Sequence, residues 1–219
     1  MTFLQNGNPG YFNRYAYTMN DPINMFDPDG RESWLVSRPL SAPAGIAANH
    51  MFVLVRDDAT GQVSRFSYGP QGHPTKNPGK LVSHSGTGTK TDIDDGAFAG
   101  AFLADRKNAE SFGVTASPIN ASDADVIAAG NAVNGMLGTP QSPGEGAPNY
   151  SITPDNAGAA SRGDLQANSN SAATAVANIA SGSQSQAMPP SSINPGANDQ
   201  WVISTCQSVN PDGGASSSC

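Results

Sequence analysis

The chain has 219 residues, a net charge of −7 and a pI near 4.7, and only 13% of its residues are charged. Nucleic-acid-binding domains usually cluster Lys and Arg to displace counterions from phosphates. The 11 Lys and Arg here are dispersed, which disfavours a nuclease and predicts no nucleic-acid partner. No apolar run approaches the roughly 20 residues that span a bilayer, so no transmembrane segment is predicted.

Two turn signals lie close together near the N-terminus, Asn-Asp-Pro at residues 20–22 and Asp-Pro-Asp-Gly at residues 27–30. Pro fixes φ, Asp bonds its own backbone, and Gly accepts a positive φ. The aromatic residues that precede them, Tyr-Phe at 11–12 and Tyr15 and Tyr17, suit short β-strands. The composition of this segment predicts a small β-meander with tight turns.

This order of residues resembles the end of the core of RHS-repeat proteins, where N-R-Y-x-Y runs into N-x-P-x-N-x-x-D-P-x-G. The resemblance covers residues 6–31. In that family a strand-rich shell precedes the segment, and a variable C-terminal domain, usually a toxin, follows it. Some members cleave themselves after D-P-x-G-L, whereas Arg31 occupies the Leu position here, so self-cleavage at this junction stays open.

The resemblance implies an antibacterial toxin that is secreted as part of a longer protein and delivered into a target cell. Its implied partners are the RHS shell and a cognate immunity protein. We expect residues 1–31 to end the RHS core, 32–48 to form a linker, 49–205 to form the toxin domain and 206–219 to form a flexible tail. Pro39, Pro43 and Gly45 suggest the linker because they interrupt regular elements. Cys206 and Cys219 lie in the tail, either as a disulfide or as free thiols.

A β-hairpin is predicted at residues 50–68. Residues 50–56 read as one strand, 57–61 as a turn, and 62–68 alternate polar and apolar side chains as in a half-buried strand. A further short strand is expected at 80–84. Residues 92–106 fit either a strand or a helix.

Two helices follow. Ser122 is a good N-cap for a helix through Leu137, which Gly138 ends. A second helix of small residues opens at Ser169 or Asn170 and ends before Gly182. The expected fold class is α+β: a small antiparallel sheet packed with two or three helices, rich in loops.

The candidate catalytic residues are His50, at the start of the strongest strand, and Ser169, at the start of the second helix. Histidine is the usual base near pH 7, and the free N–H groups of a helix N-terminus stabilise a developing anion. Asn168, Asn170 and Ser171 surround the serine as supporting residues. This pair predicts nucleophilic attack on an acyl group.

The order of a strand histidine followed by an Asn-nucleophile helix start resembles circularly permuted papain-like enzymes. In that resemblance His50 takes the place of the strand histidine, and Ser169, after Asn168, takes the place of the cysteine. It implies a hydrolase or acyltransferase that acts on a peptide, a peptidoglycan amide or a lipid ester. A hydroxyl in place of a thiol requires a stronger base.

Other interpretations of these residues stay open. Asn and Ser at a helix start are also ordinary caps, and a toxin could act without catalysis by binding a target-cell component or a membrane. No cofactor and no metal are expected, since His73, His84 and Asp92 or Asp94 lack the spacing of a known ligand motif. Asp94 or Asp95 could orient His50, but the spacing favours neither.

Overall fold

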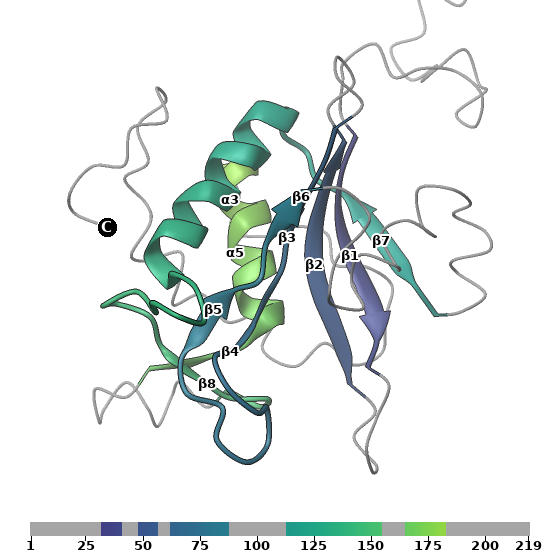
Figure 1. The fold of residues 1–219 in the computed structure, drawn as a ribbon. Helices are drawn as coiled ribbons and strands as arrows, with labels where there is room; N and C mark the ends of the chain where they lie inside the picture. The colour runs from purple at the N-terminus through teal and green to yellow at the C-terminus, as the bar shows by residue number, and fades with distance from the viewer. Residues whose placement is uncertain (1–31, 41–47, 57–61, 88–112, 155–164, 183–219) are drawn as a thin grey trace, which may run out of the picture. The chain divides into compact units, whose positions relative to one another are not determined.

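The computed structural model describes residues 32–40, 48–56, 62–87, 113–154 and 165–182. Within these ranges most strands precede the first helix, and two short strands lie between the two helices. Figure 1 shows the arrangement of these elements. The elements are β1 (Ser33–Pro39), β2 (Asn49–Arg56), β3 (Val63–Phe66), β4 (Tyr68–Pro70), β5 (Leu81–Ser83), β6 (Gly86–Thr87), β7 (Thr115–Pro118), α3 (Asp123–Leu137), β8 (Asn149–Tyr150), β9 (Gln166–Ala167) and α5 (Ser169–Ser181).

The main sheet has five antiparallel strands in the order β6-β3-β2-β1-β7. β2 lies at its centre and pairs with β1 along its whole length, from Ser33 opposite Val55 to Pro39 opposite Asn49. On its other edge β2 pairs with β3 only from Val53 to Arg56. The first half of that edge is therefore not paired with β3. Two small sheets, antiparallel β4–β5 and parallel β8–β9, complete the strand pairing.

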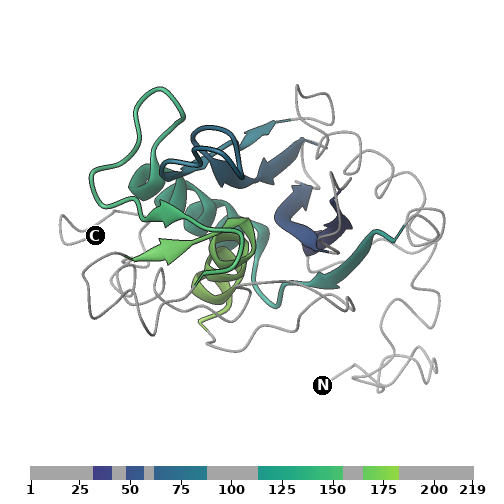
Figure 2. The same cartoon turned by 90° about the horizontal axis from the view of Figure 1, so that it is seen from below.

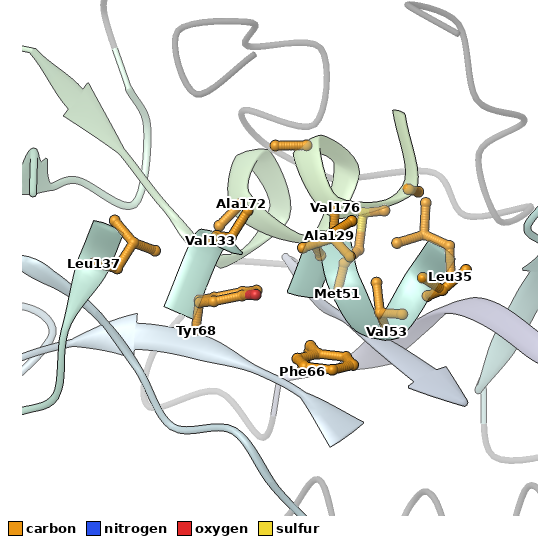
Figure 3. Packing of buried hydrophobic residues seen from close by; sticks show 14 of the residues in the cluster. Leu35, Met51, Val53, Phe66, Tyr68, Ala129, Val133, Leu137, Ala172 and Val176 are labelled. Carbon is orange, nitrogen blue, oxygen red and sulfur yellow. The ribbon is translucent and has the colours of Figure 1, made fainter. Parts of the chain in front are cut away.

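The two helices cover one face of the sheet (Figures 1 and 2). Side chains alternate between faces along a strand, and one face of β2 packs Met51, Val53 and Val55 against the helices. Figure 3 shows Phe66 and Tyr68 in the same cluster as apolar residues of α3 and α5. The other face carries a second buried cluster of Trp34, Val36, Phe52, Leu54 and Val114. Each face of the sheet thus carries a buried apolar cluster.

Helix α3 begins as its sequence predicts. The Ser122 hydroxyl accepts a hydrogen bond from the Asp125 N–H at 3.2 Å, and acidic residues in the first turn favour the helix dipole. The carboxylate of Asp123 also accepts a hydrogen bond from the Ser33 hydroxyl at 2.5 Å, which ties the helix start to β1. Gly138, with φ near 68°, ends the helix.

Helix α5 is buried on all sides along most of its length, from Ser169 to Asn178. Four alanines, at positions 172, 173, 175 and 177, give it a narrow surface that neighbouring elements can approach closely. Three of its buried polar residues, Ser169, Asn170 and Ser171, form the N-terminal turn, where hydrogen bonds compensate for their burial. Thr174 and Asn178 are buried further along the helix. A helix of this kind belongs to the interior of the domain.

The α+β prediction is confirmed, as are the helix starting after Ser122 and the small-residue helix. The linker prediction for 32–48 is corrected, because Ser33–Pro39 forms the buried strand β1. Pro39 stands at the last position of that strand, where a missing N–H does little harm. The predicted RHS segment 1–31, residues 92–106 and the tail 206–219 lie outside the described residues.

Replacing Gly130 with Ala should destabilise the domain by about 1–3 kcal/mol, because a Cβ there would lie 2.4 Å from the Phe66 ring. The intrinsic helix preference of Ala, about 1 kcal/mol over Gly, acts in the opposite direction. Gly135→Ala in the same helix is the matched control, since its Cβ would meet nothing within 4 Å. Chemical denaturation should show a loss for Gly130→Ala and a gain for Gly135→Ala. Equal gains in both variants would contradict the close packing of α3 on β3.

Candidate functional site

The N-terminal turn of α5 is tightly organised by its own side chains. The Asn168 side-chain oxygen accepts hydrogen bonds from the N–H groups of Asn170 (3.0 Å) and Ser171 (3.1 Å). The Ser171 hydroxyl accepts one from the Asn168 N–H at 2.9 Å, which completes a capping box. The Asn168 amide nitrogen donates to the Ile152 carbonyl at 3.1 Å, fixing the turn to the preceding loop.

Asn170 joins this helix turn to the strand that carries His50. Its Oδ1 accepts from the Met51 N–H at 2.8 Å, and its Nδ2 donates to the Asn49 carbonyl at 3.0 Å. A carboxamide presents a donor and an acceptor side by side, so it satisfies the part of the β2 edge that β3 leaves unpaired. Backbone N–H and C=O groups lie in the plane of a sheet, and Asn170 therefore reaches the strand from its edge, on both sides of His50.

The His50 ring lies on the face of the sheet opposite the helices. It stacks on Phe52 with a centroid separation of 6.2 Å and an interplanar angle of 25°. Its Nε2 lies 3.3 Å from the Ser67 hydroxyl. Its cross-strand neighbour in β1 is Arg38, which is buried. His50 thus stands among polar groups at the rim of an apolar face.

Ser169 is the first residue of α5, and only 6% of its surface is exposed. Its hydroxyl lies 3.4 Å from Asn170 Oδ1, a long hydrogen bond. The fold brings the Ser169 turn and the His50 strand together through Asn170. The His50 imidazole bonds Ser67 and the Ser169 hydroxyl bonds Asn170, so each candidate has a partner of its own.

The remaining histidines have local partners. His73 Nδ1 accepts from the Thr75 N–H at 3.3 Å, and His84 Nε2 lies 3.2 Å from the Pro70 carbonyl. Within the described ranges, no three His, Cys, Asp or Glu side chains gather as metal ligands would. Asp92, Asp94 and Asp95 and both cysteines lie outside those ranges. No helix in the described part of the chain combines the length and apolarity that a bilayer crossing needs.

Two neighbours of His50 are missed by sequence reasoning, Ser67 and Arg38. Both positions depend on strand register. Val53 pairs with Phe66, so continuing by one residue sets Ser67 beside Phe52 and diagonal to His50. Arg38 falls in the segment predicted as a linker. The alternation of residues 62–68 indicates the face on which Ser67 lies, but the partner residue requires the register.

Tyr150 lies in β8, beside β9 and the start of α5. Burial raises the pKa of its phenol above the ordinary value of 10.0, since the charged phenolate is poorly solvated there. The neutral ring packs against the main apolar cluster. Tyr150 is therefore an apolar support for the helix turn below pH 10.

Replacing Asn170 with Ala should destabilise the domain by about 2–6 kcal/mol, because the Met51 N–H and the Asn49 carbonyl each lose a partner at roughly 1–3 kcal/mol. Hydrogen exchange of the Met51 amide should be faster in Asn170→Ala than in the parent chain. Ser181→Ala is the control in the same helix, since the Ser181 hydroxyl bonds only carbonyls of its own helix. A Met51 amide that stays protected in Asn170→Ala would contradict the bridge.

Stability should fall with rising pH once the pH passes 10, and the Tyr150→Phe variant should lose less stability over the same range. Stability falls rather than rises because the pKa of Tyr150 is raised in the folded state. The unfolded chain then releases the phenolic proton first, so this contribution is complete below pH 10 and is lost as pH rises through the folded pKa. Urea unfolding from pH 8 to 11 measures it. Parallel curves for the two proteins would refute the assignment.

Comparison with models of known protein families, with curated proteins and with solved structures gave no match. Function is therefore inferred from the residues of this chain and their arrangement.

Proposed function

We propose that the chain is an acyl hydrolase or acyltransferase in which His50 is the base and Ser169 is the nucleophile. The observation that carries the proposal is the Asn170 bridge, which bonds the backbone on both sides of His50 and belongs to the turn that begins with Ser169. A base and a nucleophile on separate elements need such a rigid connection, because small displacements between them slow the reaction strongly.

The proposed chemistry follows from these groups. His50 accepts the Ser169 proton as the hydroxyl oxygen attacks the carbon of an acyl carbonyl. The π electrons of the C=O bond move to its oxygen, which becomes an oxyanion. The positive end of the α5 dipole stabilises that anion, while the N–H groups of Asn170 and Ser171 stay bonded to Asn168. The oxyanion collapses, the C–N or C–O bond to the leaving group breaks, and the His50 proton passes to the leaving group. Water, or another acceptor, then releases the acyl group from Ser169.

We propose further that this enzyme is the toxin of an RHS-repeat protein, secreted and delivered into a competing bacterium. Support comes from residues 6–31, whose turn and aromatic pattern resembles the end of an RHS core. The proposed partners are the RHS shell and an immunity protein. The net charge of −7 favours an immunity protein with a basic contact surface. The substrate would be a peptide, a peptidoglycan amide or a lipid ester.

A second candidate is a toxin that binds a target-cell component without catalysis. The burial of Ser169, 6% exposed with its hydroxyl near Asn170, favours this alternative, because a capping turn has the same features. The same mutants separate the two candidates.

Production in the bacterial cytoplasm and, separately, in the periplasm should arrest growth in one compartment, and co-production of the adjacent open reading frame should restore growth. In the toxic compartment His50→Ala and Ser169→Ala should each restore growth. The Ser169 hydroxyl makes one long hydrogen bond and is not the N-cap, so Ser169→Ala should cost about 1 kcal/mol of a stability of roughly 5–15 kcal/mol. Melting curves should therefore remain close to that of the parent chain.

Ser171→Ala is the matched control, since Ser171 caps the same turn. The Ser171→Ala protein should remain toxic. Persistent toxicity in both His50→Ala and Ser169→Ala would reject the enzyme in favour of the binding toxin. Harmlessness of the parent chain in both compartments would reject the toxin.

A further inference from the structure

We propose that Ser67 is a positioning residue for His50, which holds the imidazole ring in one orientation and one tautomer. The inference rests on the proposed function, because it completes the base of that reaction. Ser67 was not among the residues that the sequence indicated. Its role follows from its place between β3 and β4, where the ladder with β2 has ended.

The Phe52 ring and the Ser67 hydroxyl both orient the His50 ring. The Phe52 ring stacks against its face at 6.2 Å, which limits the plane of the imidazole. The Ser67 hydroxyl lies 3.3 Å from Nε2, which limits rotation within that plane. Only 1% of Ser67 is exposed, so water competes little for this hydrogen bond.

The position of Ser67 is itself fixed through its backbone. The Ser67 carbonyl accepts from the His84 N–H at 2.8 Å, and the Ser67 N–H donates to the Ser85 hydroxyl at 3.2 Å. The Ser85 oxygen lies 2.9 Å from Asn134 Oδ1 in α3, and the Ser83 hydroxyl donates to the same Oδ1 at 2.8 Å. A chain of hydrogen bonds thus connects helix α3 to the Ser67 backbone, and Ser67 to His50.

The chemical consequence concerns the two ring nitrogens. A neutral imidazole carries one N–H and one lone pair. When Nε2–H donates to the Ser67 oxygen, the lone pair resides on Nδ1. Nδ1 is then the basic nitrogen that the proposed reaction uses. Ser67 takes no part in bond making: it sets which nitrogen is basic and where that nitrogen points.

The test uses the full chain and two readouts. Long-range ¹H–¹⁵N spectra report the tautomer of each of the three histidines, with His50 assigned by its absence in His50→Gln. Growth inhibition in the toxic compartment reports activity at matched protein levels. Ser67→Ala should lower the Nε2–H fraction of His50 and reduce toxicity by roughly 10- to 100-fold. Ser67→Thr, which keeps a hydroxyl, should preserve both.

Ser33→Ala is the matched control, since it deletes another buried serine hydroxyl with a side-chain partner, at the far end of the β1–β2 ladder from His50. It should leave the His50 spectrum and toxicity unchanged. An unaltered His50 tautomer in Ser67→Ala would overturn the proposal, as would an altered tautomer with full toxicity. The spectra do not require turnover, so they test the Ser67–His50 bond separately from the enzyme. If Ser67→Ala shifts the His50 tautomer but His50→Ala stays toxic, the bond is retained and the enzyme is rejected. If Ser67→Ala fails to fold, Ser85→Ala tests the same orientation through the Ser67 backbone, and an unchanged His50 spectrum there overturns it.

Discussion

The arrangement of the candidate site depends on one side chain, the carboxamide of Asn170. The central strand β2 pairs fully with β1, but β3 reaches only its second half. A buried backbone N–H or C=O without a partner costs about 1–3 kcal/mol, so the open half of that edge requires another donor and acceptor. Asn170 provides both from the start of α5. The same two bonds place the helix N-terminus beside the backbone of His50.

This connection requires a helix that can enter the interior with its polar turn intact. The alanines of α5 make it narrow, and the N–H groups of Asn168, Asn170 and Ser171 find partners within the turn. Helix α3 also packs closely on a strand, because Gly130 leaves room for the Phe66 ring of β3. Small residues on both helices therefore let strands and helices pack at short range around the site.

The two faces of the sheet have different roles. One face forms the main core with the helices, while the other carries a second apolar cluster with His50 at its rim. Beside the His50 ring lie the Ser67 hydroxyl and, on the adjacent strand, the buried Arg38. The hydroxyl and the stacked Phe52 ring orient the imidazole at the rim of the apolar cluster.

Sequence by itself determined the elements whose signals are local. Ser122 and Gly138 bound α3, Asn and Ser at 168–171 begin α5, and alternation predicted the β2–β3 hairpin. It also singled out His50 and the α5 turn, because the residue types are distinctive. Only the tertiary structure decided that Ser33–Pro39 is a strand, that Asn170 bonds the β2 edge, and that Ser67 meets His50. These contacts join residues 17 to 121 positions apart, and they depend on strand register and helix packing, which no short window of sequence encodes.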